Sequence, residues 1–165
     1  MTPGLFPMLA RFNAWANGHI YDCCAKLPDA EYRRDRKAFF GSIHATLNHL
    51  LVVDMAWRAR IEGGVVGVKS LDQILYYDLS ALRTARIAED EALIRTVDGL
   101  GPNDSTRILK YRFMNGAPGE TPADIVLITL FNHQTHHRGQ VHTMLTQAGV
   151  TPPPLDIIVF PGAQQ

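Results

Sequence analysis

The chain has 165 residues, of which 46 % are hydrophobic, and this suits one domain (residues 1–165) built around one substantial core. Its 16 Lys and Arg residues balance 16 Asp and Glu, and no long run of either sign stands out, so we expect no nucleic-acid partner. The first residues lack a signal-peptide pattern, and no apolar stretch reaches the roughly 18 residues that a membrane span requires. Cys23 and Cys24 are sequence neighbours, which rarely form a disulfide. Together these features predict a cytoplasmic protein with reduced thiols and no membrane partner.

Hydrophobic periodicity predicts two helices in the first part of the chain. The first covers residues 3–27, with Thr2 as its N-cap, and its apolar residues recur at spacings of three and four. The second covers residues 39–62 and ends at Gly63. The strongly charged segment 29–37 is expected to connect the two.

A third, long helix is predicted over residues 70–98. Ser70 and Gln73 have the spacing of a capping box, and apolar residues at helical spacing follow as far as Gly99. Apolar and basic residues then alternate at positions 109–113, before a group of turn-forming residues. This alternation indicates a short strand or an extended excursion.

A fourth helix is predicted over residues 122–147. Thr121 suits the N-cap and Pro122 the first helical position, where its missing N–H costs nothing. The apolar tail at residues 155–160 is expected to cover part of the protein surface. Four amphipathic helices with a long connection between the third and the fourth predict an all-α fold, a four-helix bundle.

The strongest chemical signal is a cluster of histidines in the fourth predicted helix. His133 and His137 are four residues apart, so on a helix they project about 40° apart, one turn above each other, and can present ring nitrogens to one ion. Such a pair also occurs by chance, because histidine is an ordinary partly buried residue as well as the commonest metal ligand. Apolar residues before and after these histidines indicate that the helix is embedded, which favours a metal site. Unpaired imidazoles on its inner face would otherwise lose their hydration without any compensating interaction. His136 and His142 point in other directions.

A third ligand is expected from another helix, because two ligands make a weak site. His44 and His49 lie five residues apart in the second predicted helix and therefore on different faces. We favour His49, which small and apolar residues flank at helical spacing. His19, in the first predicted helix, is the reserve candidate, although its position is more typical of the edge of a core. The predicted metal ligands are thus His49, His133 and His137.

Three segments of the chain resemble the DinB-like family of metal-binding proteins. They are WAN at residues 15–17, TLNHLLVVD at 46–54 and NHQTHHRGQ at 132–140, of which the last is the most specific. The resemblance extends over nearly the whole chain. It implies a four-helix bundle that forms a homodimer and binds a divalent ion, zinc or nickel, through three histidines, which correspond here to the three just chosen. It implies no DNA binding.

A site with three neutral histidines would leave at least one coordination position open, as in catalytic rather than closed structural sites. An ion held in this way lowers the pKa of a coordinated water, which would support hydrolysis of a small molecule, or binds a thiolate, which would support group transfer. Some members of the family are transferases or isomerases that use a low-molecular-weight thiol. The resemblance therefore implies a thiol-dependent S-transferase or a small-molecule hydrolase. The alternative is a non-catalytic homodimer in which the ion stabilises or regulates the bundle.

The sequence offers no clear general base. Zinc proteases with the H-E-x-x-H motif place Glu directly after the first His, whereas Gln134 occupies that position here, which disfavours peptide hydrolysis. Asp54 is predicted either to orient a metal ligand or to pair with an Arg or Trp in the core. Arg138 and Gln140 are expected to fix helix contacts or to orient the ligands. Both tryptophans are expected to belong to the core.

Overall fold

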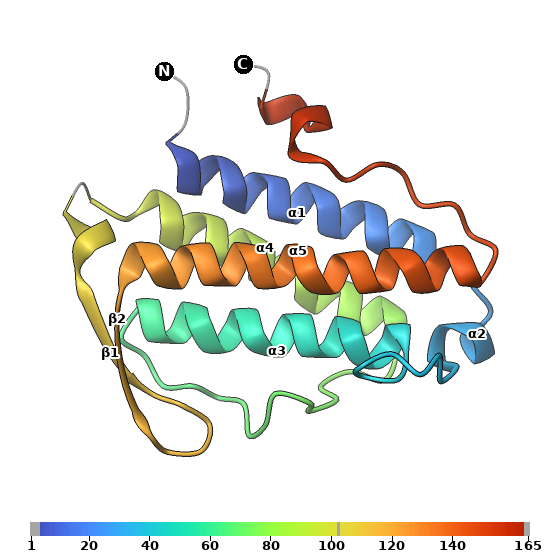
Figure 1. Cartoon of the computed structure of the whole chain (residues 1–165), viewed down its shortest axis with the longest axis horizontal. Coiled ribbons are helices and arrows are strands. Elements are labelled where there is room, and N and C mark those ends of the chain that lie inside the picture. The colour runs from blue at the N-terminus through green and yellow to red at the C-terminus, as the bar shows by residue number, and fades with distance from the viewer. Residues whose placement is uncertain (1–3, 102, 164–165) are drawn as a thin grey trace.

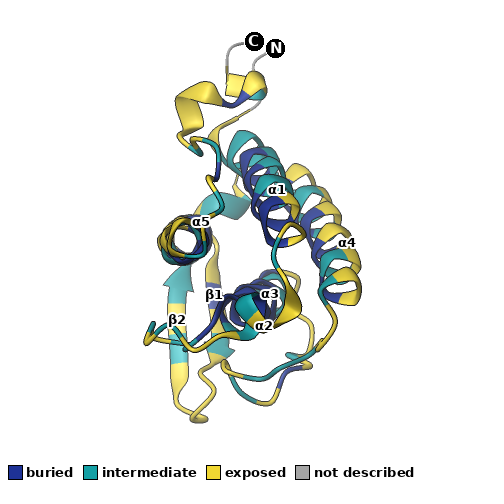
Figure 2. Cartoon of the chain, turned by 90° about the vertical axis from the view of Figure 1, so that its right-hand side faces the viewer, coloured by how far each residue is buried: buried dark blue, intermediate teal, exposed yellow. Residues whose placement is uncertain are grey.

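Four long helices dominate the computed structural model, which describes residues 4–101 and 103–163 (Figure 1). They are α1 (Leu5–Cys24), α3 (Ile43–Ile61), α4 (Leu79–Asp98) and α5 (Ala123–Gln147). α1 packs against α4 and α5, and α3 packs against the same two helices, so each helix has two neighbours (Figure 2). The predicted all-α, four-helix bundle is therefore confirmed. The expected start signal at Thr2 lies outside the described residues.

The smaller elements lie outside the four long helices (Figure 1). α2 (Asp29–Arg33) is a short helix with two acidic residues in its first turn, inside the segment expected to be only a connection. β1 (Ile108–Arg112) and β2 (Pro118–Pro122) form an antiparallel hairpin in the long connection between α4 and α5 (Figure 1). β1 confirms the predicted short strand. The described part of the chain also contains three 3-10 turns, namely η1 (Asp104–Thr106), η2 (Ile157–Val159) and η3 (Pro161–Ala163).

The predicted start of the third helix is wrong by nine residues, about two and a half helical turns. α4 begins at Leu79 rather than Ser70, and the Asp78 side chain caps it by accepting from the backbone N–H of Ala81. Residues 62–78 instead form a second long connection, between α3 and α4. The reason is tertiary, because Asn48 on α3 accepts hydrogen bonds from the backbone N–H groups of Leu75 (2.9 Å) and Tyr76 (3.0 Å).

The other two helix starts shift by a few residues. α3 begins at Ile43, where Ser42 accepts a hydrogen bond from the N–H of Ala45, so the predicted residues 39–42 stay outside the helix. α5 begins at Ala123, with Pro122 in the N-cap position and no side-chain cap. The predicted Thr cap is absent there because residue 121 belongs to β2 and pairs with β1.

The core contains a polar centre as well as apolar clusters. Arg86 on α4 lies 2.9 Å from Asp54 on α3 and 2.9 Å from Asp90 on its own helix. Asn17 on α1 donates to Asp90, and all four of these side chains are buried. The network thus joins α1, α3 and α4. Of the two predicted roles for Asp54, the structure supports the core ion pair.

The C-terminal tail covers one edge of the bundle, as predicted. Phe160 is 9 % exposed and packs against Phe12 and Trp15 of α1. Cys23 and Cys24 are buried and unbridged. Within the described parts of the chain, no helix is both long enough and apolar enough to cross a membrane.

Candidate metal centre

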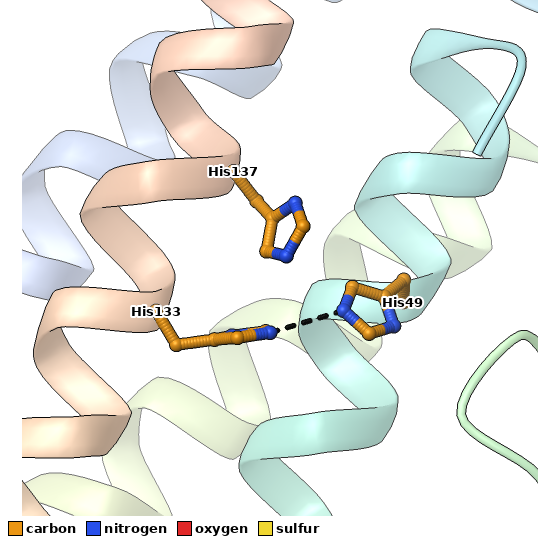
Figure 3. A group of neighbouring side chains, drawn as sticks. All are labelled: His49, His133 and His137. Carbon is orange, nitrogen blue, oxygen red and sulfur yellow. Dashed lines mark hydrogen bonds between the residues drawn. The ribbon is translucent and has the colours of Figure 1, made fainter. Parts of the chain in front are cut away.

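The three predicted metal ligands come together where α3 and α5 pack against each other (Figure 3). One ring nitrogen from each of His49, His133 and His137 lies within 4.8 Å of the other two. The closest approach joins Nε2 of His49 to Nε2 of His133, at 3.1 Å. His19 and His44 do not belong to this group, and His44 instead contacts the carbonyl of Tyr76.

The spacing of these nitrogens suits a small divalent ion. Four-coordinate zinc holds imidazole nitrogens at about 2.0–2.1 Å, which places two ligand nitrogens about 3.3 Å apart. The 3.1 Å between His49 and His133 is close to this value. Without an ion, this contact is a hydrogen bond: because Nδ1 carries the proton of neutral His49, Nε2 of His133 donates to Nε2 of His49 (Figure 3). The residues present therefore fit a divalent cation on geometry and on donor chemistry.

Two of the three imidazoles are oriented by acceptors on their outer nitrogens. Nδ1 of His49 donates to the carbonyl of Leu71 (2.7 Å), and Nδ1 of His137 donates to Oε1 of Gln140 (2.8 Å). Both bonds place the Nε2 lone pair toward the centre, which is the usual arrangement for metal-binding histidines. Within the described structure, Nδ1 of His133 is buried and has no hydrogen-bond partner.

The surroundings keep the three rings neutral. Burial lowers the pKa of His49 and of His137 below the ordinary value for histidine. Burial lowers the pKa of His133 further, to about 3, with additional contributions from the other two rings. Neutral imidazole is the form that binds metal ions.

Two cavities adjoin the triad, one lined by His49 and His137 and the other by His133. The Phe40 cavity has a volume of about 460 Å³ and is lined by His49, His137 and the ring of Phe40, which stacks on His49 at 3.9 Å between centroids. The Trp57 cavity has a volume of about 450 Å³ and is lined by His133 and Trp57. The triad therefore lies between two spaces, each large enough for a small molecule.

Leu71 lines both cavities and separates them. Leu71 was not among the predicted site residues, because it lies in the segment wrongly predicted as helix and only the fold brings it to the site. Trp57 was expected to be core. It does pack against Tyr111, but its exposure to the cavity makes it part of the site as well.

The structure shows different contacts for the three polar residues of α5 that lie near the triad in sequence. Gln140 orients His137. Arg138 is buried and donates to Asn13 of α1, so it holds α5 against α1 rather than orienting a ligand. Gln134 is fully buried and donates to the carbonyl of Leu50 on α3 (3.3 Å), so its amide joins α5 to α3.

Comparison with known proteins agrees with this architecture. The model of the DinB family matches residues 1–165. This chain belongs to the DinB family. It is 26 % identical to "Protein DinB" of Bacillus subtilis (strain 168) over 164 residues, covering 90 % of this chain and 88 % of that protein. A crystal structure of a DinB-like protein from Bacillus cereus ATCC 10987 has the same fold, with a TM-score of 0.65 and 21 % identity over 85 % of this chain and 90 % of that one.

Proposed function

We propose that this member of the DinB family is a metal-dependent enzyme that transfers a group between two small molecules, of which one is a low-molecular-weight thiol. In this proposal His49, His133 and His137 bind a divalent ion, zinc or nickel. The observation that carries it is the position of three neutral, converging imidazoles between two separate cavities.

The protein's own residues would hold the centre and exclude water from part of it. Gln140 and the backbone of Leu71 fix two rings, and Phe40 covers one face of His49. A divalent ion in such a site supplies Lewis-acid chemistry, which lowers the pKa of a thiol or a water that reaches it. The thiol would occupy one cavity and its reaction partner the other.

Transfer is favoured over hydrolysis because the site lacks a carboxylate suited to activating water. In the described structure Asp72 is the one carboxylate that lines either cavity, and the hydroxyl of Ser70 lowers its pKa, which weakens it as a base. Asp54 is engaged with Arg86. A hydrolase or a non-catalytic metal protein would need only one of the two cavities, or neither.

We also propose that the chain forms a cytoplasmic homodimer, as the family resemblance implies. Ile125 and Ile128, one turn apart on α5, are 48 % and 50 % exposed and form an apolar spot on the bundle surface. Light scattering during size-exclusion chromatography would give twice the monomer mass. A monomer at micromolar concentration would contradict this part of the proposal.

The metal claim is tested by elemental analysis of the purified and EDTA-treated protein. We expect about one zinc or nickel per chain in the wild type, and loss of most of it in His137→Ala. His142→Ala is the matched control, because His142 is on the same helix but outside the triad. Equal metal content in the two variants would overturn the assignment.

The reaction claim is tested by incubating the metal-loaded protein with several low-molecular-weight thiols and electrophiles. We expect thiol and electrophile to disappear in equal amounts, only in the presence of the metal. Consumption of an ester or amide without a thiol would instead identify a hydrolase. Full metal loading without any turnover would favour the non-catalytic alternative.

A further inference from the structure

Arg60, near the C-terminal end of α3, has no acidic partner among the residues that the structure describes. Its Nη2 donates to the backbone carbonyl of Arg112 (2.9 Å), whereas its Nε is buried and, in the described structure, has no acceptor. The guanidinium stacks on Trp57, 4.6 Å from the ring centroid, and burial lowers its pKa. No carboxylate of the described residues lies within ion-pair distance of it.

Arg58, two residues earlier on the same helix, has acidic partners, so the lack of one is specific to Arg60. Arg58 lies 2.7 Å from Glu89 and 2.9 Å from Glu62, so its charge is compensated twice. Arg60 projects from a different face of α3 and lines the Trp57 cavity. A partly desolvated cation without a counter-charge is costly, and a bound anion would remove that cost.

A third cavity continues the Trp57 cavity beyond Arg60. This basic cavity has a volume of about 480 Å³, and its cations are Arg60, Lys69, Lys110 and Arg112. Among its described lining residues there is no Asp or Glu, although the whole chain has no net charge. Within the described residues, Lys110 alone of the four pairs with a carboxylate, that of Glu120 at 3.3 Å.

The two cavities share a wall. Arg60, Phe113 and Met114 line both of them, and the last two belong to the turn of the hairpin. A continuous path therefore runs from His133, past the ring of Trp57, to the guanidinium of Arg60 and on to the other cations. Its character changes from apolar near the histidines to positively charged at the far end.

We infer that this path binds a substrate with an apolar body and an anionic headgroup, a carboxylate or a phosphate. The headgroup lies at Arg60 and the basic cavity, the apolar body lies against Trp57, and the reactive end lies at His133. This inference rests on the proposed reaction centre and adds the chemical class of one substrate. The Phe40 cavity, with its aromatic wall, is then left for the second reactant.

The binding of two matched probes tests the inference. 4-Phenylbutyrate and 4-phenylbutanamide have the same apolar body and differ in charge. Calorimetric titration of the wild type, both metal-loaded and EDTA-treated, should show about tenfold tighter binding of the carboxylate, the factor expected for one charge-assisted hydrogen-bond pair. Because Arg60 is separate from the triad, the preference should persist without metal.

Two substitutions identify the group responsible. Arg60→Met keeps an unbranched apolar stem but removes the charge, and it should abolish the preference for the carboxylate. Arg95→Met, on the exposed side of α4, should leave the preference intact. Arg60→Lys should retain part of it. If Arg60→Met does not fold, as judged by circular dichroism, the exposed Lys69 gives a second variant, Lys69→Met, which should weaken carboxylate binding alone.

The outcomes also separate this inference from the proposed function. Equal affinities of the two probes would overturn the anionic subsite, whatever the metal content. A preference that survives Arg60→Met but disappears on metal removal would mean that the carboxylate binds the ion directly, which also overturns it. A preference that depends on Arg60 in a protein that binds no metal would retain the subsite and reject the metal centre.

Discussion

Each imidazole of the triad is held in a different way. A backbone carbonyl holds His49 and a side-chain amide holds His137, while Nδ1 of His133 has no hydrogen-bond partner within the described structure. Of these two hydrogen bonds, a single substitution can remove the one from His137 to Gln140 without replacing a metal ligand. At the scale of single residues, the geometry of the site therefore depends on this amide.

We predict that Gln140→Leu weakens metal binding by about tenfold, because the His137 ring loses the acceptor that fixes its orientation. Competition with a fluorescent chelator measures the affinity. Gln147→Leu, at the exposed C-terminal end of the same helix, should bind metal like the wild type. Unchanged affinity in Gln140→Leu would show that helix packing alone orients the ring.

At the scale of elements, the irregular segment between α3 and α4 depends on one side chain of α3. Asn48 is fully buried, and its Oδ1 accepts from the backbone of Leu75 and Tyr76. The same segment supplies the carbonyl of Leu71 to His49. Loss of this anchor should therefore affect both stability and the site.

Asn48→Ala should lower the free energy of unfolding by about 2 kcal/mol, because two backbone N–H groups lose their acceptor. Urea denaturation measures the loss, and hydrogen exchange should show faster exchange of the Leu75 and Tyr76 amides. Asn132→Ala, at an exposed position of α5, serves as the control and should change the stability little. Slow exchange in Asn48→Ala would show that apolar packing holds the segment by itself.

At the scale of the whole molecule, the buried ion pairs in the centre of the bundle hold several helices in register. We predict that Asp54→Ala destabilises the fold by about 3–5 kcal/mol, because Arg86 stays buried with one counter-charge fewer. Asp22→Ala breaks an exposed pair with Arg83 and should cost less than about 1 kcal/mol. Similar losses in the two variants, measured by chemical denaturation, would refute a special role for the buried pair.

Metal should also stabilise the whole molecule, since the three ligands come from two helices that separate on unfolding. With zinc or nickel at about 100 times its dissociation constant, the stabilisation is about 2.7 kcal/mol. For a chain of this size, that raises the Tm by about 5–10 °C. Calorimetry with and without EDTA measures the shift, which should vanish in His137→Ala. A shift of the same size in that variant would place the stabilising ion elsewhere.

Periodicity was sufficient to predict most of the fold. The spacing of apolar residues identified the four long helices and the short strand, because burial of one face repeats at the helical or strand period in the sequence itself. It failed at residues 70–78, where Ser70 and Gln73 mimic a helix start. Asn48 decides the conformation of that segment from 27 and 28 residues away, and a local pattern contains no such information.

The amino-acid sequence by itself determined the bundle and the identity of the triad. His133 and His137 share one helix, where spacing fixes their relation. The small and apolar residues around His49 pointed to it as the partner on another helix, and the family resemblance implied the same residue. Only the tertiary structure decided what surrounds them. The site also includes Leu71, Trp57 and Arg60, which come from two segments whose relative position depends on packing. The positive charge of the basic cavity depends on which cations pair with a carboxylate in the folded protein and which do not.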